Sequence, residues 1–257
     1  MAGRRLSARV ERTAALLSGF IAAALGLMLL EGLIQKGVIS RFVISPPSEV
    51  LASFPMLLFS EGLIDHALQT FGETFAAAAL AAVIGMPVGV ALDRSQLLCE
   101  ACETWIAGLA SAPLILLYPL FLVLFGRTAL TIIVMGAISG LPAIILKTRE
   151  GLGSARPVLL DVARSFNASS SQQFWKIKFP AAIPTIFMGI RLCLLLSLLA
   201  VVAVEFLIDL DGLGALISDL ANRFEMPAMY GAIVSVTVVS ACFFLVCEKV
   251  ERWLRPV

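Results

Sequence analysis

The sequence predicts an all-α, polytopic membrane protein with about six transmembrane helices and both termini in the cytoplasm. Of its 257 residues, 60% are hydrophobic and only 14% are charged, and the mean hydropathy is +0.97. Soluble domains average about 45–50% apolar and about 25% charged residues, so the chain departs from them in both measures. Several apolar runs reach about 20 residues, the length that a helix needs to cross a bilayer. These runs are apolar on every side, whereas the strands of a membrane barrel alternate apolar and polar residues.

Six predicted spans divide the chain, and we treat residues 1–257 as a single transmembrane domain. The first run follows a basic stretch, but it is too long for the apolar part of a signal peptide, so we expect a retained anchor. Helices in a bilayer pack through small residues, and the second and fourth spans carry Gly85-x-x-x-Gly89 and Gly136-x-x-x-Gly140. The spans are 13–35, 67–92, 103–125, 129–147, 184–207 and 229–248.

The positive charges orient these spans. Segments on the side of the N-terminus hold 14 of the 19 Lys and Arg residues, the opposite segments hold 4, and Arg191 lies within a span. Because Lys and Arg accumulate in cytoplasmic segments, both termini are predicted to be cytoplasmic and the protein to be a multi-pass protein of the inner membrane.

Composition excludes several other classes of site. The net charge of +1 gives no electrostatic reason to expect a nucleic acid as partner. Cys99 and Cys102 form a single C-x-x-C pair, while the only histidine, His66, is predicted on the other side of the membrane. A zinc site normally needs four ligands, so no metal site is expected, and the role of the two cysteines stays open.

The third span contains two prolines within its apolar run. Pro113 falls about 15 Å along the helix from its start, near the middle of the bilayer. Proline frees carbonyl groups that must be satisfied by neighbouring helices or by a water-lined path. We therefore predict that Ser111, Pro113 and Tyr118 line the transport pathway, with a plain kink filled by a neighbouring helix as the alternative.

Glu73 and Glu205 are two of the glutamates that fall inside predicted spans, where ionisable groups are costly and are functional candidates by default. Glu73 falls about 9 Å from the outer end of its helix, and Glu205 falls about 30 Å along the fifth span, at the outer face. The two carboxyl groups can therefore share one layer, as pathway residues or with one of them protonated. The alternative is that Glu205 reaches the interface and that Glu73 bonds to a neighbouring helix.

The one long cytoplasmic loop, at about 148–183, reads as two short helices joined by a sharp corner. Pro157 suits the first turn of a helix, and Asn167 suits the left-handed residue that ends one. Ser169 with Gln172, or Ser170 with Gln173, offers a capping box for the next helix. From these residues alone, the hairpin is either a docking element for a partner or an amphipathic segment resting on membrane lipid.

The same loop resembles the EAA loop of ABC importer permeases. The resemblance rests on Asp161-Val-Ala163-Arg164-Ser-Phe-Asn167-Ala168-Ser169, on Phe174, and on Phe179-Pro180-Ala-Ala-Ile-Pro184. Three further stretches resemble the nitrate/sulfonate/taurine branch of that family: Ser45–Leu51, Ala110–Phe121 and Gly189–Phe206. The chain departs from the family pattern where Asp161 replaces a glutamate, Val162 an alanine and Asn167 a glycine.

The resemblance implies a permease subunit, with the loop docked on a separate cytoplasmic ABC ATPase subunit. The implied partners are that ATPase, a periplasmic or lipid-anchored solute-binding protein, and a second permease copy in a homodimer. The sequence holds no G-x-x-x-x-G-K-[ST] phosphate loop. We therefore expect no enzymatic activity and no cofactor on this chain, with ATP and magnesium on the ATPase.

The resemblance also suggests a small anion, such as a sulfonate or nitrate, as the solute, although intramembrane cations are few. Two alternatives stay open at this point. One is the membrane component of a vitamin uptake system. The other is an ATP-independent channel or proton-coupled carrier with Glu73 as its proton site, for which the docking loop would be dispensable.

Overall fold

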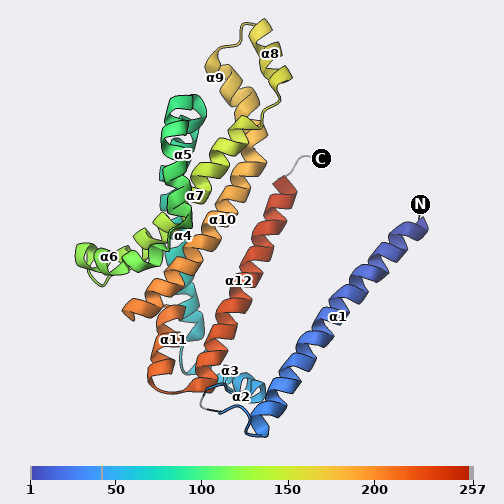
Figure 1. Ribbon diagram of the computed structural model, residues 1–257, viewed down its shortest axis with the longest axis vertical. Coiled ribbons are helices and arrows are strands. Elements are labelled where there is room, and N and C mark those ends of the chain that lie inside the picture. Colours follow the sequence, from blue (N-terminus) through green and yellow to red (C-terminus); the bar gives the residue numbers. More distant parts are fainter. Residues whose placement is uncertain (1, 42, 255–257) are drawn as a thin grey trace.

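A computed structural model describes the backbone of residues 2–41 and 43–254, and side chains within 18–249 except those of residues 20 and 42. This part of the chain is built from helices joined by short connections (Figure 1). The longer helices are α1 (Ala2–Gln35), α4 (Leu63–Arg94), α5 (Gln96–Ser111), α7 (Ala129–Gly153), α10 (Phe179–Ile208) and α12 (Met226–Leu254). The shorter ones are α2 (Pro47–Ala52), α3 (Phe54–Phe59), α6 (Tyr118–Phe125), α8 (Pro157–Ser165), α9 (Ser170–Gln173) and α11 (Leu213–Asn222).

The core lies along α7, which packs against α4 on one side and α10 on the other. Both predicted glycine motifs lie at these contacts. A Cβ added at Gly85 or Gly89 of α4 would come within 2.7 Å of side chains of α7. A Cβ at Gly136 of α7 would come within 3.0 Å of both Ala77 and Val201, so this glycine lets three helices meet. The prediction that these glycines serve close helix packing is confirmed.

Four helices among the described residues are long and apolar enough to cross a bilayer: α4, α7, the helix that includes α10, and α12. The predicted third span is not one helix. After α5 the chain turns at Pro113, passes through the 3-10 turn Leu114–Leu117 and enters α6, and the two parts are bent by 87°. Counting this pair as one span gives five. The described apolar part of α1, Ile21–Gln35, is shorter, so a sixth crossing stays a prediction.

The helices around the long loop differ from the predicted boundaries. α7 continues to Gly153 rather than ending at residue 147, and α10 begins at Phe179 rather than at Pro184. The end of an apolar run marks where hydrocarbon ends, but a helix can continue into water, where ion pairs three or four residues apart add a little stability. Lys147 pairs with Glu150 at 2.6 Å in this extension of α7. The loop therefore shrinks to a hairpin of α8, a corner and α9, which runs through the π-helical turn Phe174–Lys178 into α10.

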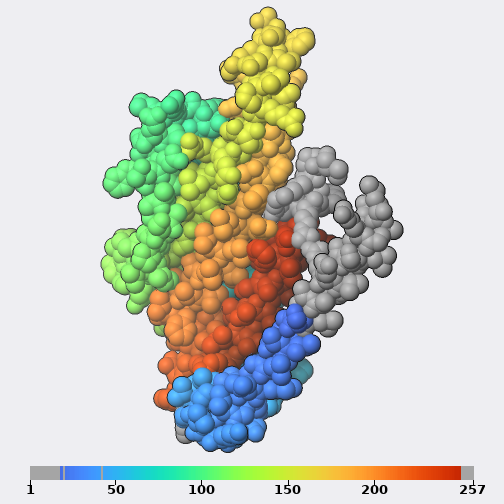
Figure 2. All heavy atoms as spheres, turned by 45° about the vertical axis from the view of Figure 1, so that its right-hand side comes forward, coloured from blue at the N-terminus to red at the C-terminus, as the bar shows by residue number. Residues whose placement is uncertain are grey.

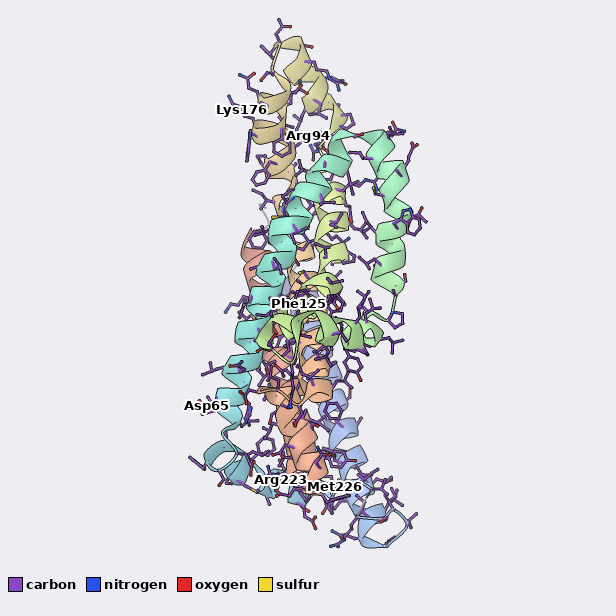
Figure 3. All side chains as sticks on the ribbon, turned by 90° about the vertical axis from the view of Figure 1, so that its left-hand side faces the viewer. Asp65, Arg94, Phe125, Lys176, Arg223 and Met226 are labelled. Atoms are coloured by element: carbon purple, nitrogen blue, oxygen red, sulfur yellow. The ribbon has the colours of Figure 1, made fainter. Side chains whose placement is uncertain are left out.

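The hairpin and α11 lie at opposite ends of the molecule. Figure 3 shows Arg94 and Lys176 at the hairpin end, and Asp65, Arg223 and Met226 at the other. In Figure 1 the first turns of α1 and the last turns of α12 both point toward the hairpin end. The structure thus agrees with a topology in which these segments and the hairpin face one compartment, while the placement of the termini in the cytoplasm stays a prediction.

Candidate functional site

The corner of the hairpin is a helix-ending motif centred on Asn167. Its φ of +54° is left-handed, as predicted for this asparagine. The N–H of Asn167 donates to the carbonyl of Arg164 at 2.9 Å, and the N–H of Ala168 donates to the carbonyl of Ala163 at 2.9 Å. These two bonds form a Schellman motif, in which the left-handed position is usually glycine. Ala163 and Ala168, both small, are therefore held together at the corner.

The second arm starts with the predicted capping box, and the pair used is Ser169 with Gln172. The Ser169 hydroxyl accepts the N–H of Gln172 at 3.3 Å, and the Gln172 side chain accepts the N–H of Ser169 at 2.8 Å. Gln173 donates to the carbonyl of Ala168 at 2.9 Å and so ties this arm to the corner. The hairpin is thus a defined structure rather than a loose loop.

Three contacts join the hairpin to the membrane helices. Lys178 lies 2.8 Å from Asp93 near the end of α4. The guanidinium of Arg94 lies 5.2 Å from the centre of the Phe174 ring. Phe174 and Phe179 pack on a small buried cluster of α7 and α10 residues, and Pro180 stands in the first turn of α10. These contacts attach the base of the hairpin directly to α4 and α10.

The outer surface of α8 carries an exposed apolar stripe. Val158, Val162 and Phe166 follow one another at four-residue spacing on one helix face, and their exposed fractions are 69%, 48% and 82%. Beside them, Asp161 and Arg164 form an exposed ion pair at 3.1 Å. Figure 2 shows that this hairpin projects beyond the rest of the molecule. A contiguous apolar stripe on a projecting polar segment is typical of a surface that binds a partner.

At the opposite end, α4 and α10 together hold the first turn of α11. The Glu205 carboxylate accepts the N–H of Gly214 at 2.9 Å and the hydroxyl hydrogen of Thr70 at 2.9 Å. The Thr70 hydroxyl oxygen in turn accepts the N–H of Leu213 at 2.8 Å. These side chains satisfy N–H groups that a helix leaves unpaired at its start.

Glu205 is fully buried and Glu73 is 5% exposed, and Thr70, three residues before Glu73 on α4, donates a hydrogen bond to Glu205. The expectation that the two share a layer is therefore confirmed. Glu205 does not reach the surface. Gln69 donates to Glu73 at 2.9 Å within α4. Glu73 also lines an open hollow together with Asp65, Gln69 and residues of α7.

The other predicted pathway residues lie at the bend after α5. Ser111 is exposed and donates to the carbonyl of Ala107 on its own helix at 3.0 Å. Pro113 is exposed at the turn itself, and Tyr118 is half-buried against the main core. None of these contacts tests a role in transport, so the pathway assignment stays a prediction.

Sequence reasoning missed the residues that position Glu205. Thr70 is fully buried, and His66 is half-buried and accepts the N–H of Gly212 through Nδ1 at 3.2 Å. A Cβ at Gly212 or Gly214 would collide with Glu205 or with the backbone of α10. The available signal was the pair of glycines shortly after an intramembrane glutamate, since glycine marks places where another group comes very close to the backbone. In the described part of the chain, no three His, Cys, Asp or Glu side chains are arranged to hold a metal.

Comparison with known proteins decides the family. Residues 81–256 match the family described as binding-protein-dependent transport system inner membrane component. The chain belongs to this family of ABC transporter permeases. It is 30% identical to the nitrate import permease protein NrtB of Synechocystis over 203 residues, which is 76% of this chain and 74% of that protein. It is 24% identical to the taurine transport system permease protein TauC of Escherichia coli, over 85% of this chain and 82% of that protein.

The fold agrees with that assignment. A solved inward-facing conformation of the MetNI methionine ABC transporter contains a chain that matches this permease with a TM-score of 0.67. The match covers 79% of this chain and 99% of that chain at 19% sequence identity. The likeness to the nitrate/sulfonate/taurine branch is confirmed, and so is an all-helical permease of the inner membrane.

Proposed function

We propose that this permease is the membrane subunit of an ATP-driven importer for a small anion such as a sulfonate, taurine or nitrate. The observation that carries the proposal is the projecting hairpin, whose apolar stripe of Val158, Val162 and Phe166 is exposed while its base is bonded to α4 and α10. Such a surface fits a groove on a cytoplasmic ATPase subunit. Movement of the ATPase would then reach the spans through the contacts at Lys178 and Phe174.

The remaining parts of the importer follow from the family. A permease of this kind works with an ATPase that supplies the free energy of ATP and with a solute-binding protein on the outer side. Two permease copies would enclose the pathway, with Glu73, Ser111, Pro113, Tyr118 and Glu205 as candidate residues near it. The choice of a small anion rests on what the relatives NrtB and TauC are named for.

The proposal is tested by isolating the tagged protein from its native membrane in mild detergent and identifying by mass spectrometry what co-purifies. We expect a P-loop ATPase and a solute-binding protein, and the latter is then screened against sulfonates, taurine and nitrate. Absence of any ATPase from a folded preparation contradicts the proposal and favours an ATP-independent carrier.

A variant makes the test specific to the hairpin. Phe166→Asp places a charge on the apolar stripe, and loss of a central apolar contact typically costs about 2 kcal/mol or more of binding free energy. We therefore expect recovery of the ATPase to fall by at least about tenfold. Phe224→Asp is the matched control, because Phe224 is also a phenylalanine with an exposed fraction of 80%, but it lies at the α11 end. Equal recovery with both variants would show that the stripe is not the docking surface.

A further inference from the structure

The buried carboxyl groups of Glu73 and Glu205 leave two oxygens without a hydrogen-bond partner. Oε1 of Glu73 accepts from Gln69, and Oε2 of Glu205 accepts from Thr70 and Gly214. Oε2 of Glu73 and Oε1 of Glu205 are both inaccessible to solvent and lack a partner. Buried polar atoms in native proteins are almost always hydrogen-bonded, so a pair of unpaired oxygens in one place calls for a specific explanation.

An ionised carboxylate is only an acceptor, so two of them side by side cannot bond to each other. Two buried negative charges in contact are also strongly unfavourable, and such pairs commonly keep one proton between them. A proton would turn one carboxyl group into a donor toward the other and would satisfy both oxygens at once. The donors already present on Glu205, together with the first turn of α11, favour Glu205 as the negative partner.

We propose that Glu73 and Glu205 together bind one proton, and that this proton holds α4 and α10 together beneath the first turn of α11. The proton comes from water on the α11 side and returns there when the pair separates. This inference goes beyond the proposed import function and does not depend on it, because it needs neither an ATPase nor a solute.

The hydrogen bonds at the start of α11 link the proposed proton to the position of that helix. The N–H groups of Gly212, Leu213 and Gly214 are bonded in turn to His66, Thr70 and Glu205. If the proton leaves, repulsion between the two carboxylates pushes α4 away from α10, and the acceptors for these three N–H groups move apart. The position of α11 therefore depends on the protonation of the pair.

Other charged groups lie around the pair and take part in its electrostatics. Asp211 acts on Glu73 as a like charge, which disfavours a second negative charge there. The guanidinium of Arg127 is bound to Asp209 and does not pair with either glutamate. Asp65 of α4 and the apolar Ile133 of α7 line the hollow beside Glu73, and His66 bonds to Gly212 next to the first turn of α11.

The direct test is infrared spectroscopy of the purified permease in detergent at neutral pH. A protonated carboxyl group shows a carbonyl stretch that an ionised one lacks, and deuterium exchange shifts it. We expect one such band in the wild-type protein. We expect the band to be lost in Glu73→Gln and in Glu205→Gln, because the amide of glutamine supplies the missing donor. The control Glu49→Gln removes an exposed carboxylate, which lies 3.6 Å from Arg41, and should leave the band unchanged.

A second measurement follows how the stability of the folded protein and the hydrogen exchange of α11 change with pH. The native state of the wild type binds one proton more than the unfolded state at neutral pH, because exposed glutamates are ionised there. Its unfolding equilibrium constant should therefore rise by up to about tenfold per pH unit, and its Tm should fall, as the pH rises from about 5 to the pH at which the folded pair loses its proton. Hydrogen exchange of residues 212–222, corrected for intrinsic rates, should quicken over the same range. Both trends should be absent in Glu73→Gln.

Several results would overturn the proposal. One is a wild-type spectrum without the carbonyl band, and another is a band that persists in both glutamine variants. Stabilisation of the wild type by sodium or calcium ions, lost in Glu73→Gln, would show that a metal cation takes the place of the proton. The wild-type spectrum decides the question even if Glu205→Gln fails to fold.

Discussion

The ammonium group of Lys178 lies 2.8 Å from the carboxylate of Asp93, which joins the π-helical turn before α10 to the end of α4. The Asp93 side chain is only 9% exposed and that of Lys178 is 28% exposed, so water screens this pair poorly. The Arg164–Asp161 pair on the hairpin is instead 67% and 69% exposed, and exposed pairs of this kind contribute little. Together with the contact of Arg94 with Phe174, the ion pair of Lys178 joins the base of the hairpin to α4, a helix that does not adjoin the hairpin in the chain.

We expect Asp93→Asn to lower the free energy of unfolding by about 1–3 kcal/mol, because it leaves a half-buried ammonium group without its partner. Transport should fall while the ATPase still co-purifies, because the apolar stripe on α8 is unchanged. The measurements are Tm in detergent, solute uptake and recovery of the ATPase. Arg164→Gln is the control for stability, because it breaks the Arg164–Asp161 pair, whose side chains are 67% and 69% exposed. A similar loss of Tm in both variants would show that the Lys178–Asp93 pair has no special role.

The corner of the hairpin gives a second prediction. Asn167→Val forces a β-branched side chain into a left-handed backbone conformation, at a cost of about 1–3 kcal/mol. Asn167→Gly should be tolerated, since glycine adopts this conformation without strain. We expect ATPase recovery and transport to fall only in the valine variant. Unchanged transport and assembly in Asn167→Val would mean that the geometry of the corner does not matter for docking.

The glycines around Glu205 give a third prediction, which concerns stability. A Cβ at Gly214 would collide with the carbonyl of Val202 and would come within 2.7 Å of the Phe206 nitrogen, both rigid backbone atoms of α10. We expect Gly214→Ala to destabilise the protein by more than about 2 kcal/mol, because α11 must shift away from Glu205. Gly72 is the matched control, since it lies inside α4 with nothing within 4 Å of an added Cβ. Gly72→Ala should be neutral or stabilising by up to about 1 kcal/mol, and Tm measurements on both variants test the contrast.

Local patterns predicted the hairpin well but not its connection to the spans. Asn167 and Ser169 act on neighbours within a few residues, so their left-handed corner and capping box could be read from the sequence. The extension of α7 to Gly153 and the early start of α10 at Phe179 depend on paired charges and on packing across helices. The lengths of the apolar runs in the sequence therefore do not show where these two helices end and begin.

The candidate site at the α11 end shows the same limit. Helical depth alone placed Glu73 and Glu205 in one layer, because rise per residue is constant. It did not predict that Glu205 faces inward and caps α11 by accepting the N–H of Gly214, nine residues later in the chain. Nor did hydropathy show that the third span bends by 87°, since its two parts together are still long and apolar enough to count as one span.

An ion pair between Glu61 and Arg223 at the α11 end gives a prediction of pH dependence. The guanidinium donates two hydrogen bonds to the Glu61 carboxylate, at 3.2 and 2.6 Å, and joins the connection before α4 to the end of α11. This hydrogen bonding lowers the pKa of Glu61 below its ordinary value of 4.5. Because the folded pKa is lowered, the stabilisation is fully present above pH 4.5 and is lost as the pH falls through the lower folded pKa.

The Arg223 side chain is 37% exposed and that of Glu61 is 16% exposed, so solvent screening limits the stabilisation to about 0.5–1 kcal/mol. We expect Glu61→Gln to lower Tm at neutral pH, and the difference from the wild type to shrink steadily as the pH falls below 4.5. Thermal unfolding of both proteins in the same detergent across this range makes the comparison. A difference that stays constant with pH would mean that Glu61 acts through packing, because an interaction that depends on its charge must vanish when the carboxylate is protonated.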